Sequence, residues 1–137
     1  MPEREIKQLQ MLLVEPETLL RRTVSLTARS LGLGQIHEAC SIAAAQRMLR
    51  EQPFSGAVIS IDCESGDKAA YDLSLLDQVR NGMSASPCSI PIAVMAECAT
   101  AELLRNLRGR DIERVILKPF RAKILLDTFA AFEAEKK

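Results

Sequence analysis

Three ionisable residues each follow an apolar run that is typical of a buried strand. The runs and the residues after them are Met11–Val14 with Glu15, Gly56–Ile61 with Asp62, and Val115–Leu117 with Lys118. In open α/β sheets, ligand chemistry gathers outside the carboxyl ends of the strands. Two carboxylates and one ammonium group would meet there if the strands lie close together. Such a group is suited to binding a cation and is compatible with a phosphate.

The rest of the sequence predicts the elements that would position these groups. Apolar runs of strand length alternate with segments whose apolar residues recur at helical spacing. We expect strands at Met11–Val14, Gln35–Ala39, Gly56–Ile61, Ile90–Ala96 and Val115–Leu117, and helices at about 17–31, 41–49, 73–80, 100–107 and 121–135. Five βα units with right-handed crossovers favour a three-layer, doubly wound parallel sheet of order 2-1-3-4-5 with five helices.

Composition narrows the class of protein. The 137 residues suit one domain over 1–137 with no output domain, and Lys+Arg equals Asp+Glu at 18 each, so no net field favours nucleic acid. No apolar run approaches the roughly 20 residues that span a bilayer. The four cysteines are scattered and the single histidine, His37, is expected at the surface, so reduced thiols in the cytoplasm are favoured over zinc.

In the order and spacing of its motifs, the chain resembles the CheY-like receiver domain of bacterial response regulators. The motifs are Leu12–Glu15 with Leu20–Arg22 behind it, Val58–Asp62, Pro91–Ala96 and Leu117–Phe120. The resemblance implies a flavodoxin-like fold and phosphoryl transfer to Asp62 from a histidine kinase or a phosphotransfer protein. It further implies that Lys118 neutralises the phosphoryl oxygens and that Glu15 and Asp62 belong to a Mg²⁺ site.

Several positions depart from the pattern of that family. The second metal-binding acid falls on Pro16, the switch hydroxyl on Ala96 and the switch aromatic on Val115. The segment after Asp62 is predicted to be a polar loop, Cys63–Asp67, with extra length before the third helix. These departures predict an impaired Mg²⁺ and switch site.

Acidic and basic residues near the site leave further alternatives open. Glu17, acting through a water molecule, and Glu64 or Asp67 are the alternative sources of a metal-binding carboxylate. The most basic local segment, residues 105–114, could be an ordinary solvated turn or a docking surface for an acidic or phosphorylated partner. Its arginines are Arg105, Arg108, Arg110 and Arg114.

Two functions follow from these observations. The first is a stand-alone, non-enzymatic receiver-like signalling protein of a two-component phosphorelay, which acts by protein–protein interaction and keeps Asp62 as the acceptor position. The second is a phosphorylation-independent pseudo-receiver that serves as an interaction module. A flavin-binding or enzymatic relative of the fold is disfavoured, because Glu15-Pro16-Glu17 has no glycine- or serine-rich phosphate loop and its acids would repel a phosphate.

Overall fold

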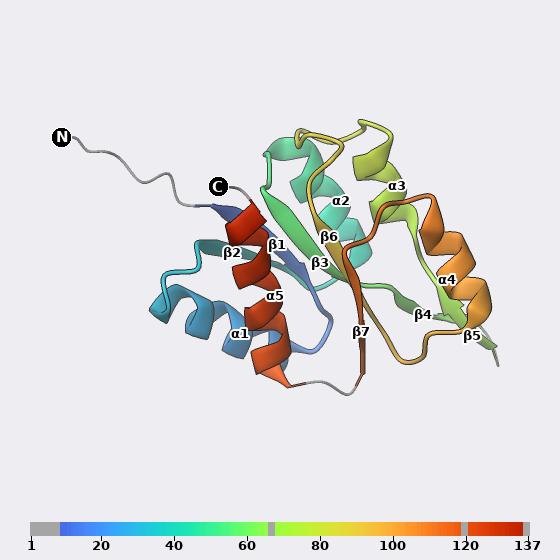
Figure 1. Cartoon of the computed structure of the whole chain (residues 1–137), viewed down its shortest axis with the longest axis horizontal. Helices are drawn as coiled ribbons and strands as arrows, with labels where there is room; N and C mark the ends of the chain where they lie inside the picture. The colour runs from blue at the N-terminus through green and yellow to red at the C-terminus, as the bar shows by residue number, and fades with distance from the viewer. Residues whose placement is uncertain (1–8, 66–67, 119–120, 136–137) are drawn as a thin grey trace.

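The computed structural model describes residues 9–65, 68–118 and 121–135, which form a three-layer α/β fold (Figure 1). The strands are β1 (Gln10–Val14), β2 (Gln35–Ala39), β3 (Gly56–Ser60), β4 (Asp62–Ser65), β5 (Lys68–Tyr71), β6 (Ile92–Ala96) and β7 (Arg114–Leu117). The helices are α1 (Thr18–Ser30), α2 (Ile42–Glu51), α3 (Ser74–Arg80), α4 (Ala101–Arg108) and α5 (Ala122–Glu135). Within the described ranges, no helix is long and apolar enough to cross a membrane.

The main sheet has five parallel strands in the order β2-β1-β3-β6-β7. In chain order these are the five predicted strands, so the predicted order 2-1-3-4-5 and the doubly wound, flavodoxin-like class are confirmed. Helices α1 and α5 pack together on one face, and α2 and α3 pack together on the other. Strand β3 is central, and its carboxyl end therefore lies between those of β1 and β6.

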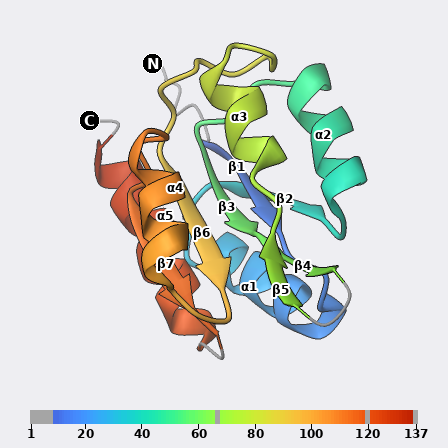
Figure 2. The same cartoon turned by 90° about the vertical axis from the view of Figure 1, so that its right-hand side faces the viewer.

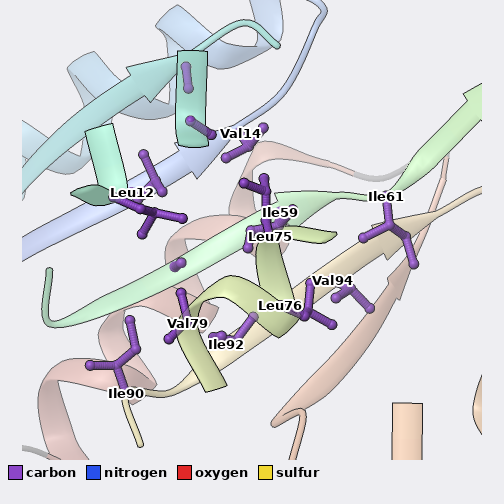
Figure 3. Packing of buried hydrophobic residues seen from close by; sticks show 14 of the residues in the cluster. Leu12, Val14, Ile59, Ile61, Leu75, Leu76, Val79, Ile90, Ile92 and Val94 are labelled. Carbon is purple, nitrogen blue, oxygen red and sulfur yellow. The ribbon is translucent and has the colours of Figure 1, made fainter. Parts of the chain in front are cut away.

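Burial on both faces explains why the central strands are apolar without polar alternation. Odd- and even-numbered residues of one strand point to opposite faces. In β3, for example, Ala57 and Ile59 join the core beneath α2 and α3, whereas Val58 joins the core beneath α1 and α5. Figure 3 shows the first of these cores, in which strand residues such as Ile59 meet Leu75 and Leu76 of α3.

Helices α2 and α4 begin directly after residues that cap their first turns. Ser41, the predicted N-cap of α2, accepts a hydrogen bond from the Ala44 amide at 3.1 Å. Thr100 caps α4 in the same way, through the Leu103 amide at 3.0 Å. Capping of this kind satisfies amides that a helix leaves without partners in its first turn, so both boundaries are set locally by the sequence.

The predicted polar loop after Asp62 is wrong for residues 63–65, and Asp67 lies outside the described residues. Strand β3 ends at Ser60, the buried Ile61 follows, and Asp62 opens β4, which pairs with β5 in an antiparallel hairpin. Figure 2 shows this hairpin standing apart from the main sheet. A two-stranded ribbon outside the main sheet needs no continuous apolar run, so residues 62–65 carry no strand pattern. Asp62 is therefore two residues beyond the central strand.

One strand boundary also needs correction. Strand β6 begins at Ile92 instead of Ile90, since Pro91 has no amide hydrogen to donate and contributes only its carbonyl, which accepts from the Ala57 amide at 3.1 Å. His37, expected at the surface, is partly exposed there, and Phe54 packs against its ring with centroids 5.4 Å apart. Burial lowers the pKa of His37, and its Nε2 lies 2.5 Å from Oε1 of Gln10.

The close packing of β3 against α5 generates a stability prediction. A Cβ atom at Gly56 would lie 2.8 Å from Cδ2 of Phe132 and 3.3 Å from Sδ of Met11. Because both neighbours are fully buried, we expect Gly56→Ala to lower the free energy of unfolding by roughly 1–3 kcal/mol. Gly109→Ala is the matched control, since a Cβ there would meet nothing within 4 Å. Urea denaturation measures both variants, and equal losses would contradict the packing argument.

Candidate functional site

Asp62 and Lys118 meet although 56 positions separate them in the sequence. The Nζ atom of Lys118 lies 3.1 Å from Oδ2 of Asp62, and the two side chains are only 20% and 23% exposed. Lys118 directly follows β7, and β6 separates that strand from β3. The ammonium group therefore reaches across the carboxyl end of β6 to meet the acid. The predicted proximity of these two groups is found in the structure.

Ser60 holds the lysine in this position, and the sequence analysis did not identify it. The Nζ atom of Lys118 donates a hydrogen bond of 2.6 Å to Oγ of Ser60, the last residue of β3, which is buried. A signal was available in the sequence. Ser60 is the one polar residue between Gly56 and Asp62, and alternation along an extended chain turns residues 60 and 62 to the same side.

The two oxygens of the Asp62 carboxylate differ in their contacts. Oδ1 accepts a hydrogen bond of 3.2 Å from the amide of Glu97, in the loop after β6. Oδ2 is buried and accepts no directed hydrogen bond from the described residues, so its contact with Lys118 is a charge interaction alone. The carboxylate thus links three elements, namely the start of the hairpin, the β6–α4 loop and the end of β7.

Glu15 is buried at the carboxyl end of β1, with 3% exposure. Its Oε2 atom accepts a hydrogen bond of 3.0 Å from the Glu17 amide, while its Oε1 atom is buried without a hydrogen-bond partner among the described residues. Arg21 braces this corner by donating to the Glu15 carbonyl at 2.7 Å and pairing with Glu38. A buried carboxylate oxygen without a partner is costly, so Oε1 is a candidate ligand for a cation.

The described residues do not complete a Mg²⁺ site. Among them, no group of three or more histidine, cysteine, aspartate or glutamate residues is placed to hold a metal ion. Glu15 and Asp62 follow β1 and β3 at this edge, Pro16 has no side-chain oxygen, and Glu17 and Glu97 are exposed. Asp67 and the side chain of Glu64 lie outside the described part of the chain. Mg²⁺ bound by one or two carboxylates usually needs substrate phosphates as further ligands.

The two switch positions carry no polar atom in their side chains. Ala96 ends β6 and is fully buried, and its carbonyl accepts a hydrogen bond of 2.8 Å from the Lys118 amide. Val115 in β7 is half-buried and packs against the core beneath α2 and α3. Neither side chain can form a hydrogen bond to a group on Asp62.

The four predicted arginines do not form one free surface. Arg110 pairs with Asp77 of α3 through two contacts, Nε to Oδ1 at 2.7 Å and Nη2 to Oδ2 at 3.2 Å. Arg114 donates to Oγ1 of Thr128 in α5 at 3.3 Å. Arg105 and Arg108 are exposed in the last turn of α4. Only the second pair is therefore presented outward from α4.

Arg80 is a structural residue that the sequence analysis did not identify. Its guanidinium donates to four backbone carbonyls, those of Cys88, Ile90, Arg110 and Asp111, at 2.7–2.9 Å. Burial lowers its pKa, although the charge of Asp111 acts in the opposite direction. Arg80 thereby fixes the loop that leads into β6 and the loop that connects α4 to β7.

Arg108 and Arg110 are two residues apart and should differ in their effect on stability. Arg110→Ala removes the fork that joins the α4–β7 loop to α3, and we expect it to lower the free energy of unfolding by about 1 kcal/mol. Arg108→Ala, which removes an exposed side chain, should stay within about 0.5 kcal/mol of the parent. Thermal and urea unfolding measure both. Equal effects would show that the Asp77 contact contributes nothing.

A double-mutant cycle measures the interaction of Lys118 with Asp62. We expect Lys118→Met, Asp62→Asn and the double variant to give a coupling energy of about 1–2 kcal/mol, because both side chains are largely buried. The exposed pair of Lys123 and Asp127, also 3.1 Å apart, is the control and should give roughly 0.3–0.5 kcal/mol. A coupling no larger than that of the control would mean that the site pair contributes no more than a solvated surface contact.

In comparisons with known proteins, this chain finds matches by structure and not by sequence. Neither the family models nor the sequences of curated proteins match this chain. Solved structures do. The receiver domain of the Francisella response regulator 1452 superimposes with a TM-score of 0.74 at 13% identity, and the match covers 94% of this chain and 99% of that domain.

Two further structures give the same result. The Vibrio cholerae chemotaxis protein CheY4 has a TM-score of 0.74 at 17% identity over 92% of this chain and 99% of its own. HP1043, an orphan response regulator of H. pylori, has a TM-score of 0.71 at 17% identity over 90% and 95% of the two chains. Likeness at such low identity concerns the backbone. This chain has the fold of the CheY-like receiver domains of response regulators.

Proposed function

We propose that the protein is a receiver-like signalling module of a two-component phosphorelay, in which Asp62 is the phosphoryl-acceptor position. The observation that carries the proposal is the ion pair of Asp62 with Lys118, held by Ser60 at the carboxyl end of the sheet. The receiver fold of the similar structures supports it. The donor would be the phosphohistidine of a histidine kinase or a phosphotransfer protein.

The proposed chemistry is transfer of a phosphoryl group between two side chains. An oxygen of Asp62 forms a bond to phosphorus as the bond from phosphorus to the donor histidine nitrogen breaks, which leaves an acyl phosphate and a histidine. Hydrolysis by water returns the carboxylate and releases inorganic phosphate. Because charge develops on the phosphoryl oxygens, Lys118 would stabilise the transferred group, and the Glu97 amide would donate to one of its oxygens.

Each neighbour of Asp62 then has a distinct role in the proposal. Lys118 supplies the cation, and Ser60 is a positioning residue that holds the ammonium group at the end of β3. The carboxylates of Glu15 and Asp62 fall short of a complete metal site among the described residues. Mg²⁺, when bound, would supply further neutralisation of the phosphoryl oxygens.

A phosphorylation-independent pseudo-receiver is the second candidate function. It is favoured by the apolar side chains at Ala96 and Val115 and by Pro16, which remove the hydrogen bonds and the ligand that would make a modified Asp62 differ from an unmodified one. Under this alternative, the pair of Asp62 and Lys118 stabilises the fold. Binding to a partner would then be the whole function of the protein.

Both candidates act through contact with another protein and without enzymatic turnover. Helix α4 offers a surface for this, because Arg105 and Arg108 are exposed in its last turn and Leu104 is 45% exposed beside them. Guanidinium groups next to an apolar side chain suit an acidic partner. The balanced net charge disfavours nucleic acid as that partner, and a cytoplasmic location fits the proposed donor.

Beryllofluoride, a mimic of the phosphoryl group, separates the two candidates. We expect saturable changes in the amide NMR shifts of Asp62, Glu97 and Lys118 when beryllofluoride and Mg²⁺ are added, because the mimic places new negative charge beside these groups. Asp62→Asn should abolish the changes, and Asp127→Asn, on the exposed pair of α5, should leave them intact. A protein that shows no change at saturating concentration, while remaining folded, is a pseudo-receiver.

A further inference from the structure

The hairpin and the β6–α4 loop are joined by two contacts that form a closed ring of four residues. Asp62 and Tyr71 are cross-strand partners at the base of the hairpin. Oδ1 of Asp62 accepts from the Glu97 amide at 3.2 Å, and the hydroxyl of Tyr71 donates to the Cys98 carbonyl at 3.2 Å. Because Glu97 and Cys98 are consecutive, the acid and the phenol hold the same short stretch of loop.

The base of this hairpin is held by a backbone hydrogen bond. The Asp72 amide donates to the Ile61 carbonyl at 2.8 Å, which closes the hairpin just below the pair of Asp62 and Tyr71. The Tyr71 ring is half-buried against the core beneath α2 and α3. The Glu97–Cys98 stretch lacks such support, since both residues are exposed.

Electrostatics links the same residues. The pKa of the Tyr71 phenol is raised, mainly by its hydrogen bond to the thiol of Cys98, whose Sγ atom lies 3.7 Å away. Partial desolvation raises it further, the hydroxyl of Thr100 lowers it, and the charges of Cys98 and Asp62 add smaller increases. A negative charge near a phenol disfavours the phenolate, so the sign of the Asp62 effect is the expected one. The Asp62 charge is the smallest of these effects, so the link between the two residues rests on their contacts with Glu97 and Cys98.

We propose that Asp62 and Tyr71 are coupled through the Glu97–Cys98 peptide, because both side chains hold this stretch just before helix α4. A group added to Asp62 would compete for the Glu97 amide and move this peptide, and the hydrogen bond from Tyr71 to the Cys98 carbonyl would change with it. Thr100, the N-cap of α4, follows two residues later. The start of the helix that presents Arg105 and Arg108 would thus move with the acid. The physiological trigger rests on the proposed function, whereas the coupling itself does not.

Tyr71 is the only tyrosine, so its ring signals in NMR spectra are assigned without ambiguity. We expect Asp62→Ala, which removes the acceptor of the Glu97 amide, to shift the Tyr71 ring signals and the Cys98 amide relative to the parent protein. Asp127→Ala, on the exposed pair of α5, is the control and should leave these signals unchanged. Tyr71 and Cys98 signals that are identical in the Asp62 variant and the parent overturn the inference.

A second variant leaves Asp62 unchanged and tests the coupling from the other side. By reciprocity of coupling, Tyr71→Phe, which removes the hydroxyl that donates to the Cys98 carbonyl, should shift the Glu97 and Asp62 amides in NMR spectra. Glu97 and Asp62 signals that stay fixed in this variant, while the protein remains folded, would refute the coupling.

Beryllofluoride distinguishes failure of this inference from failure of the proposed function. If the mimic binds at Asp62, shown by a bound fluorine signal, the Tyr71 ring and the first-turn amides of α4 should shift with saturation. Binding without a Tyr71 shift overturns the inference and leaves the acceptor role of Asp62 standing. If no mimic binds, the acceptor role fails, and the two variants at Asp62 and Tyr71 still decide whether these residues are coupled.

Discussion

The interaction on which the site depends is the charge contact between Asp62 and Lys118 across the end of β6. It can form only because three parallel strands bring their carboxyl ends to one edge of the sheet, with the lysine on the outer strand and the acid beyond the central one. Each group is about four-fifths buried, so each would be costly without the other. Ser60 fixes the geometry by accepting from the ammonium group, which leaves Oδ2 of Asp62 without a directed hydrogen bond.

The order of the strands was predictable from the sequence because it follows from burial and chain direction. Apolar runs without alternation indicate strands covered on both faces, and five βα units leave few arrangements once crossovers are right-handed. The hairpin of β4 and β5 was not predictable on the same grounds, because its sequence is polar at the start and its two strands pair with each other and not with the main sheet. Apolar periodicity arises where strands are buried within the main sheet, so strands outside that sheet need not carry it.

Prediction of the site from the sequence is limited in the same way, because it also depends on apolar periodicity. Asp62 and Lys118 could be found because each ends an apolar run, and the topology then brings them together. Ser60 was recognisable in principle, whereas the contacts of Tyr71 with Cys98 and of Arg110 with Asp77 depend on loops whose course no periodicity encodes. The arginine segment shows the consequence. Of four cations close in sequence, Arg105 and Arg108 are exposed on α4, whereas Arg110 and Arg114, the latter also exposed, contact α3 and α5.

Charge bears differently on the two proposed functions. Asp62 and Lys118 form a neutral pair, and the ammonium group also contacts Ser60. An acyl phosphate would replace the charge of the Asp62 carboxylate with up to two on the phosphoryl oxygens. Under the receiver proposal, a cation beside Lys118, such as a metal ion or a side chain of the partner, would stabilise that added charge. An interaction module needs no such cation, because the pair of Asp62 and Lys118 is neutral as it stands.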